Sequence, residues 1–259
     1  MCKKYELTNQ IKQIKERLTK QIINLYRIRA LIDFDDVKAG DLGGYIENEG
    51  NLSHYGNCWV YDEACAYGYA HVSDHAKVRH LSHVRGRVYG NAEVYGKALI
   101  TRYAKVYDHA CVYGSAHVAG NIYGNAHVCD HARVYSNSHI YQHARVSHDV
   151  FVYDHARIYG HSKVSGSACI YSNAKIYGQA AIKGFAKIYG KVYGSALVSG
   201  RAAVYGSVYG NAKISGSVKV WGRAYGKAKI DKQSNVKSVA QNYEVYQSDN
   251  VVKIIDKTE

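Results

Sequence analysis

The sequence predicts an all-β fold, a three-sided parallel β-helix, and three observations carry this prediction. From His54 to Ile230 the chain repeats one hexad in the order aliphatic, Tyr, Gly, Asn, Ala, Lys, as in IYGNAHV at residues 122–128. The composition is biased as in repeat proteins, with 26 tyrosines, 24 glycines and no proline among 259 residues. The third observation is a set of shortened steps between hexads, which recur on a fixed rotation.

The hexad itself indicates the type of coil. A six-residue period fits neither an amphipathic helix nor an isolated alternating strand. It fits a β-solenoid in which each hexad forms one flat side, with the aliphatic and Ala positions pointing inward. The Gly-Asn and Asp-His pairs would then form the corners, because these residues tolerate left-handed backbone conformations.

The shortened steps predict the number of sides. From one aliphatic position to the next, five steps have four residues instead of six. These steps run from Val84 to Val88, Val118 to Ile122, Ile188 to Val192, Val204 to Val208, and Val220 to Ala224. They are separated by multiples of three steps, so all five lie on the same side of a three-sided coil. We therefore predict about ten coils of 16 to 18 residues.

The segments that flank the repeat predict caps, which would cover the open ends of the β-helix and their unpaired strand edges. Residues 11–22 predict a short amphipathic helix. The apolar residues with helical spacing in this segment are Ile11, Ile14, Leu18 and Ile22. The segment NLYRIRALIDF, residues 24–34, predicts a strand.

The C-terminal segment NYEVYQSDNVVKIID, residues 242–256, predicts two strands around a Ser-Asp-Asn turn. The expected organisation is then an N-terminal cap over residues 1–45, formed by a short helix and a strand, followed by the β-helix over residues 46–230. A β-stranded C-terminal cap occupies residues 231–259.

Residues 25–64, LYRIRALIDFDDVKAGDLGGYIENEGNLSHYGNCWVYDEA, together with the VYGNA hexads that follow, resemble a hexapeptide-repeat family that is widespread in bacteriophages and bacterial genomes. The resemblance covers nearly the whole chain after the predicted helix. It implies a single-stranded β-helix with a left-handed coil, and a phage origin. Because most members of this family are uncharacterised, the resemblance implies much about fold and little about function.

Charge and cysteine content predict the environment. The formal net charge is +13, so we expect a surface that attracts nucleic acid, a nucleotide or another polyanion. The six cysteines form no CxxC pair and are expected to be free thiols in a reducing cytosol. No apolar run approaches the roughly 20 residues of a membrane span, and the first residues, Met-Cys-Lys-Lys-Tyr, lack the apolar core expected of a signal peptide. We expect a cytoplasmic protein without a membrane partner, in the host cytoplasm if it is phage-encoded.

One side of the predicted coil carries a tyrosine ladder. The residue that follows each aliphatic position points outward, and on this side it is Tyr in most coils: Tyr89, Tyr107, Tyr123, Tyr141, Tyr159, Tyr177, Tyr193, Tyr209 and Tyr225. We favour a structural ladder of stacked rings. Two functional interpretations stay open, a homo-oligomer interface and a platform on which bases stack.

Another side is small and basic in its later half, with serines interleaved between cations. The candidate anion-binding residues on this side are Arg145, Lys163, Lys183, Lys213 and Lys229. Cations on successive coils would lie close enough to attract one extended anion. The alternative is a solvated face that keeps a tyrosine-rich protein soluble, and the sequence does not decide between the two.

Histidines occupy one predicted corner at His75, His109, His143 and His161. No compact set of ligands with zinc spacing occurs, so we expect hydrogen bonding at the corners and no metal site. No GxxxxGKS phosphate loop is present, and no cofactor is predicted.

The function expected from these features is that of a non-catalytic binding or scaffold protein, encoded by a phage, that self-associates and binds an anionic host partner. That partner would be a host-defence protein or nucleoprotein complex, nucleic acid, or a nucleotide signal. The alternative is a hexapeptide-type acyltransferase, a class that uses a His on a loop expelled from the coils and binds its cofactor between subunits. No insertion interrupts the hexads, and every histidine within them has a regular outward or corner position. We therefore expect no enzyme activity.

Overall fold

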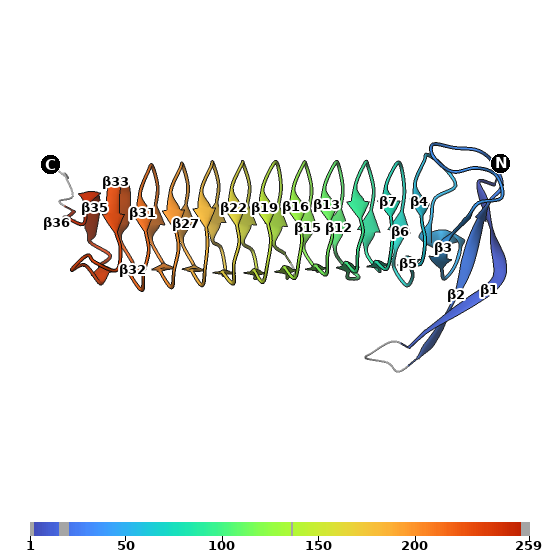
Figure 1. The fold of residues 1–259 in the computed structure, drawn as a ribbon, viewed down its shortest axis with the longest axis horizontal. Coiled ribbons are helices and arrows are strands. Elements are labelled where there is room, and N and C mark those ends of the chain that lie inside the picture. Colours follow the sequence, from blue (N-terminus) through green and yellow to red (C-terminus); the bar gives the residue numbers. More distant parts are fainter. Residues whose placement is uncertain (1–2, 16–20, 136, 255–259) are drawn as a thin grey trace. The chain divides into compact units, whose positions relative to one another are not determined.

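The computed structural model describes residues 3–15, 21–135 and 137–254, and it divides into two compact units, residues 1–130 (unit 1) and 131–259 (unit 2). Both units are parallel β-solenoids, with about 11 turns in total (Figure 1). Within the described residues the only helical element is the three-residue 3-10 turn η1 (Glu49–Asn51). The predicted all-β parallel β-helix is confirmed. Its left-handed coil stays an implication of the resemblance.

In unit 1 the short strands stack on three sides, each pairing in parallel with the strand one turn later. Side 1 consists of β5 (Cys65–Ala66), β8 (His83–Val84), β11 (Leu99–Ile100) and β14 (His117–Val118). Side 2 consists of β6 (His71–Val72), β9 (Arg87–Val88), β12 (Lys105–Val106) and β15 (Asn121–Ile122). Side 3 consists of β4 (Trp59–Val60), β7 (Lys77–Val78), β10 (Glu93–Val94), β13 (Cys111–Val112) and β16 (His127–Val128).

Unit 2 has a three-sided pattern of the same kind. Side 1 consists of β17 (Arg133–Val134), β20 (Phe151–Val152), β23 (Cys169–Ile170), β26 (Lys187–Ile188), β29 (Ala203–Val204), β32 (Lys219–Val220) and β34 (Ser238–Val239). Side 2 consists of β18 (His139–Ile140), β21 (Arg157–Ile158), β24 (Lys175–Ile176), β27 (Lys191–Val192), β30 (Ser207–Val208), β33 (Arg223–Ile230) and β35 (Tyr243–Ser248). Side 3 consists of β19 (Arg145–Val146), β22 (Lys163–Val164), β25 (Ala181–Ile182), β28 (Leu197–Val198), β31 (Lys213–Ile214) and the end of β33.

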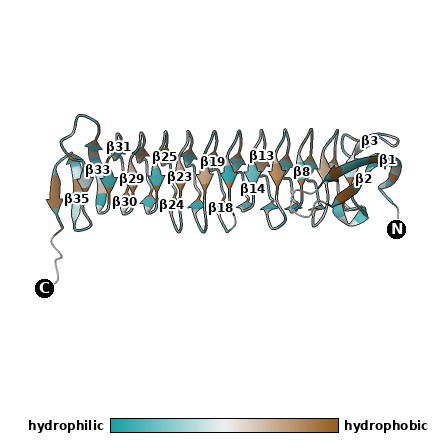
Figure 2. Cartoon of the chain, turned by 90° about the horizontal axis from the view of Figure 1, so that it is seen from below, coloured by the Kyte–Doolittle hydropathy of each residue, from teal (hydrophilic) through white to brown (hydrophobic). Residues whose placement is uncertain are grey.

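The core of each unit is the interior of its coils. The second residue of nearly every short strand is aliphatic and fully buried, as Ile100 is in unit 1 and Ile176 in unit 2. The inward Ala of each hexad, such as Ala98 or Ala174, is buried with it. Figure 2 shows the resulting alternation of hydrophobic and hydrophilic residues along the coils. The predicted inward positions are therefore confirmed.

The corners use left-handed backbone, as expected. Asp74 and Asp108 have φ values of 60° and 59°, and Gln142 has 59°. In unit 1 the carboxylate of Asp74 accepts a hydrogen bond from the backbone N–H of Gly90 in the next coil, at 2.9 Å. Side chains of this kind thus stabilise the corner one turn ahead of their own.

The five shortened steps all connect side 1 to side 2 within their unit. Val88, Val106 and Ile122 pair in register in unit 1. In unit 2 Val208 pairs with both Val192 and Ala224. The predicted register is confirmed.

The N-terminal segment differs from its prediction. Strand β1 (Tyr5–Lys15) and strand β2 (Ile22–Ala30) form an antiparallel hairpin, and β2 pairs in turn with β3 (Leu42–Ile46). The predicted amphipathic helix over residues 11–22 is therefore wrong where the chain is described, and residues 16–20 lie outside the described residues. The physical reason is pairing with a distant segment, such as Ile14 with Ile23, which overrides a local helical spacing.

The predicted C-terminal turn is confirmed, since β35 pairs antiparallel with β36 (Val251–Lys253) around Ser248, Asp249 and Asn250. The domain boundaries at residues 45 and 230 stay predictions. Five cysteines are free thiols, and Cys2 lies outside the described residues. The part of the chain that the structure describes contains no helix that is long and apolar enough to cross a membrane.

Candidate functional site

The predicted tyrosine ladder exists on side 2 of each unit. In unit 1 the ring centroids of Tyr89, Tyr107 and Tyr123 are 4.9 Å apart, with ring planes within 5°. In unit 2 centroids are 4.8 to 5.0 Å apart along the series Tyr141, Tyr159, Tyr177, Tyr193, Tyr209 and Tyr225. Each inner ring face is covered by its neighbours. A base inserted between two rings would need about twice the 3.4 Å rise of stacked bases, so no base fits within the ladder.

The environment of one inner ring favours its neutral hydroxyl. Burial, followed by the neighbouring rings of Tyr123 and Tyr89, raises the pKa of Tyr107 to about 12. A homo-oligomer interface on this side stays a prediction.

The predicted basic residues lie on or beside side 3 of unit 2, but not in one row. Arg145 pairs with Lys163, and Lys213 pairs with Lys229. Ala181 and Leu197 occupy the two intervening coils. Lys183 follows two residues after Ala181 and belongs to the next outward column. The five candidates thus form two pairs and one separate lysine.

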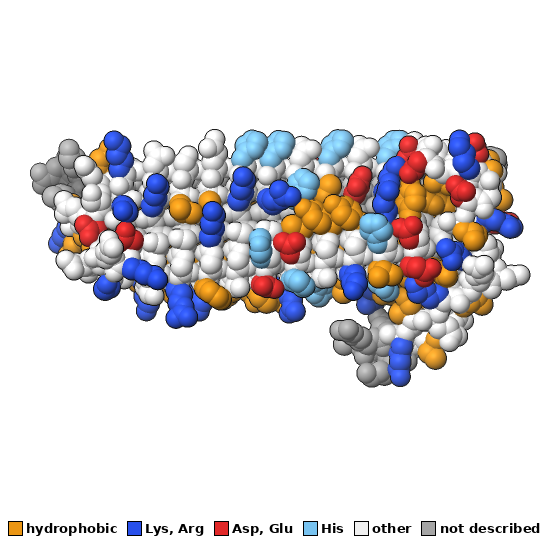
Figure 3. Space-filling model, viewed as in Figure 1, with side chains coloured by type: hydrophobic (Ala, Val, Ile, Leu, Met, Phe, Trp, Pro, Cys, Tyr) orange, Lys and Arg blue, Asp and Glu red, His pale blue; other side chains and the backbone are white. Residues whose placement is uncertain are grey.

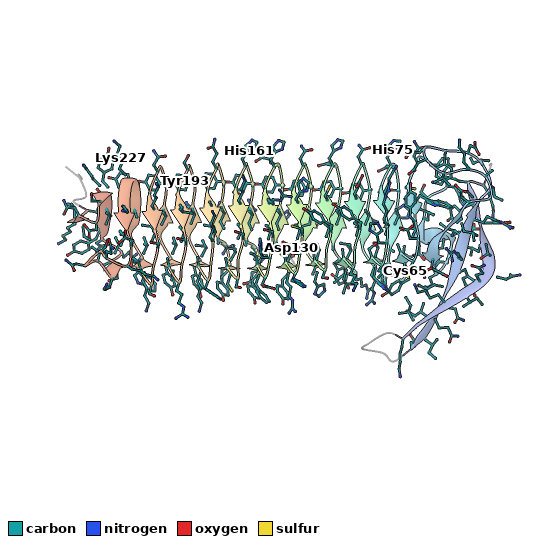
Figure 4. All side chains as sticks on the ribbon, viewed as in Figure 1. Cys65, His75, Asp130, His161, Tyr193 and Lys227 are labelled. Atoms are coloured by element: carbon teal, nitrogen blue, oxygen red, sulfur yellow. The ribbon has the colours of Figure 1, made fainter. Side chains whose placement is uncertain are left out.

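The corner histidines point away from the coils, as Figure 4 shows for His75 and His161. In unit 2 the rings of His143 and His161 stack at 4.6 Å. At three of these corners the residue before the histidine accepts a hydrogen bond from a backbone N–H of the next coil. The acceptors are Asp74, Asp108 and Gln142. No group of three or more His, Cys, Asp or Glu side chains suited to a metal ion occurs in the part of the chain that the structure describes.

One hollow in unit 1 lies between the β1–β2 hairpin and side 1. Figures 1 and 2 show this hairpin at the N-terminal end of the unit. The hairpin packs Ile14 and Ile23 against a buried cluster that includes Tyr45, Cys65 and Tyr67. This cover raises the pKa of the Cys65 thiol to about 11, because burial disfavours the thiolate.

The end of β1, Ile14 and Lys15, forms one wall of the hollow, and the volume of the hollow is about 370 Å³. On side 1, His83 lies in register between buried Cys65 and half-buried Leu99. The residues that line the hollow are Ile14, Lys15, Tyr67, His83, Arg85, Lys97 and Leu99. The lining thus combines apolar side chains, three cations and one imidazole, and contains no carboxylate.

His83 is held in a form that can accept a proton. Burial, followed by the charge of nearby Lys12, lowers the pKa of His83 below its usual value of 6.5. The ring of Tyr67 meets the imidazole edge to face at 6.0 Å. Lys12 is fixed near this site because its ammonium donates to the carboxylate of Glu63 at 3.0 Å. A neutral imidazole in a cation-lined hollow suits general base chemistry on an anionic substrate.

This site was not found from the sequence, which assigned His83 to a regular outward position without an enclosing pocket. The enclosure comes from the hairpin and not from an insertion in the hexads. One signal in the sequence was available, because His83 and Cys65 stand on side 1 directly after the cap. The burial of these two side chains could not be predicted without the hairpin, which packs against them.

Comparison with known proteins identifies a curated relative. No protein-family profile matches the chain. The chain is similar to YdcK of Escherichia coli strain K12, which is described as an uncharacterized acetyltransferase, with 38% identity over 89 residues. The aligned part is 33% of this chain and 27% of YdcK, so the chain spans well under half of that relative.

The similarity to a protein with an acetyltransferase name contradicts the expectation that the chain is not an enzyme, and we correct that expectation on this finding. The phage origin and the host partner stay predictions. The β-solenoid of about 11 turns and the similarity to YdcK are together compatible with a hexapeptide-repeat family.

Proposed function

We propose that the protein is a hexapeptide-type acyltransferase that uses His83 as its general base and an acyl-coenzyme A thioester as donor. The observation that carries the proposal is the neutral, half-buried His83 at the edge of the hairpin, in a hollow lined by cations. The similarity to YdcK supports the reaction class. The acyl acceptor would be a small amine or alcohol.

In the proposed reaction the acceptor N–H or O–H donates to the imidazole of His83 as its heteroatom attacks the thioester carbonyl carbon. The new C–N or C–O bond forms and the C–S bond breaks. The imidazolium then returns the proton to the leaving thiolate of coenzyme A, so atoms and charge balance. A base that stays neutral at pH 7 is suited to both proton transfers.

The cations that line the hollow would bind the phosphates of the donor. Lys15 and Lys97 are exposed at its rim, and a flexible ammonium is a common partner of phosphate. The apolar side chains of Ile14 and Leu99 would contact the pantetheine arm. This division matches a ligand with an apolar arm and an anionic end.

The test is release of free coenzyme A from acetyl-coenzyme A with a panel of amines and alcohols. His83→Gln should lower kcat by about 10²- to 10⁴-fold, the usual contribution of a general base, while acetyl-coenzyme A still binds. His75→Gln is the matched control, because His75 is exposed at a corner of the same unit. It should leave turnover unchanged.

A second variant tests the donor site independently. Lys97→Glu should raise KM for acetyl-coenzyme A, and the effect should be smaller for the dephosphorylated donor. Equal turnover by the native protein and His83→Gln would overturn the role of His83. Absence of both acetyl-coenzyme A binding and turnover in the native protein would overturn the proposed function.

A further inference from the structure

The positive charge of the chain is concentrated in unit 2. Residues 131–259 contain 18 Lys and Arg against 7 Asp and Glu, whereas residues 1–130 contain 16 against 14. Within unit 2 the segment from His155 to Ile230 has 12 Lys and Arg and no Asp or Glu. On the face in Figure 3, unit 2 accordingly shows many Lys and Arg side chains and few acidic ones.

The cations of this segment form an unbroken row only on side 2. Arg157, Lys175 and Lys191 pair in register on three successive coils. Ser207 follows, and then Arg223. The rings of Tyr159, Tyr177 and Tyr193, which directly follow these strands, are spaced 4.8 to 5.0 Å apart. This spacing gives the rise from one coil to the next. The row therefore places three positive charges within about 10 Å, which is two rises between paired strands.

Among the residues that the structure describes, no acidic side chain forms an ion pair with Arg157, Lys175 or Lys191. Their spacing is shorter than the Debye length of about 8 Å at physiological ionic strength, so the three charges repel one another. A ligand with regularly spaced negative charges would relieve this repulsion. Side 3 offers less, because Ala181 and Leu197 interrupt its row.

The tyrosine ladder lies next to the row, and each tyrosine stands two residues after a cation, directly behind the end of its strand. Tyr159, Tyr177 and Tyr193 contact each other face to face, which excludes bases from between the rings. Tyrosine hydroxyl groups are suited to donate to phosphate oxygens. The surface thus offers cations and hydroxyl donors to a backbone, but no stacking platform to bases.

We propose that side 2 of unit 2 binds nucleic acid through its phosphate backbone, with Arg157, Lys175 and Lys191 as the central contacts. We expect recognition to be independent of base sequence, because the contacts that carry it go to phosphate oxygens, which are the same for every base. This inference does not depend on acyl transfer, since His83 and its hollow belong to unit 1.

The test compares three variants of the full chain that each remove three positive charges from unit 2. The side 2 variant is R157Q/K175Q/K191Q. The matched control, K187Q/R201Q/K219Q, removes two lysines and one arginine from side 1 and a corner. The third variant, K163Q/K183Q/K213Q, tests the basic side predicted from the sequence. Binding of labelled single-stranded and duplex oligonucleotides is measured by fluorescence anisotropy over a range of salt concentrations.

We expect the native protein to bind oligonucleotides of different sequence alike. The slope of log affinity against log salt should become shallower by about 3 in the side 2 variant, about one for each lost phosphate contact. It should stay unchanged in the matched control. All variants should keep the native melting temperature, because the substituted side chains are outward-facing.

Four outcomes would overturn the proposal: no binding by the native protein, an equal loss in all three variants, a loss only in the side 3 variant, or a strong dependence on base sequence. Inorganic polyphosphate serves as competitor. If it binds more tightly than nucleic acid at equal phosphate concentration, the assignment to nucleic acid is also overturned.

Discussion

Replacing Gly206 with Ala should destabilise unit 2 because the shortened corner has no room for a Cβ atom. An ideal Cβ on Gly206 would lie 2.1 Å from the carbonyl oxygen of Gly222 and 2.2 Å from that of Trp221. The closest ordinary contact is 3.4 Å, so the next coil would have to move away by about 1.3 Å. The need for glycine here is the close approach of backbone, and not a positive φ.

The structure allows the cost to be worked out. A shift of this size would break the hydrogen bonds from the N–H of Ser207 to Gly222 O, at 2.9 Å, and from the N–H of Gly206 to Val220 O, at 3.1 Å. Each lost bond costs about 1 kcal/mol, and residual overpacking costs about 1–3 kcal/mol. The lower entropy of the unfolded chain with Ala offsets about 0.4–1 kcal/mol. The free energy of unfolding should therefore fall by about 2–5 kcal/mol.

Urea denaturation measures this difference, and Gly184→Ala is the comparison variant. Gly184 has a φ of 69°, and its ideal Cβ would lie 3.0 Å from the oxygen of Gly200. Its cost is mainly the left-handed backbone, about 1–2 kcal/mol. If Gly206→Ala destabilises the protein no more than Gly184→Ala does, the close approach of coils is not what requires glycine at the shortened corners.

Three further predictions concern other parts of the molecule. Because the pKa of His83 is lowered, kcat/KM should fall only as the pH drops through a midpoint below 6.5. The free energy of unfolding should also decrease as the pH falls below 6.5, because the unfolded chain then binds a proton that the folded His83 does not. A kinetic midpoint above 6.5 would contradict the buried environment of His83. Lys4 is 2% exposed and donates to the carbonyls of Gly56 and Cys58, so Lys4→Met should lower the free energy of unfolding by about 2–3 kcal/mol in urea titrations, whereas Lys3→Met should change it little. If the ladder is a homo-oligomer interface, light scattering should show an oligomer for the native protein and a monomer after Glu replaces Tyr141, Tyr159 and Tyr177.

The coils could be predicted from the sequence because their pattern is local. Each hexad states which residue points inward, and the four-residue steps mark one side. The hairpin could not be predicted in this way. The spacing of Ile11 and Ile14 is compatible with a helix, and only pairing with residues 22–30 makes the segment a strand.

The candidate site likewise combines a feature that the local pattern predicts with one that depends on distant residues. His83 was visible as an outward residue, but its burial depends on a hairpin that arrives from far away in sequence. The basic row on side 2 is different, because Arg157, Lys175 and Lys191 occupy equivalent hexad positions. Each of the three cations directly precedes the aliphatic residue of its hexad, so the register of the coils is sufficient to predict the row.

The shortened corners also affect how positions can be matched between proteins of this kind. Gly190, Gly206 and Gly222 occupy equivalent places one turn apart, and each coil bonds mainly to the coils before and after it. An alignment that is shifted by one whole turn therefore matches almost as many residues as the correct alignment. The hexads alone do not show where a coil has been gained or lost in evolution. The hairpin has no such degeneracy. A histidine in another protein is the counterpart of His83 only when its coil is counted from the hairpin.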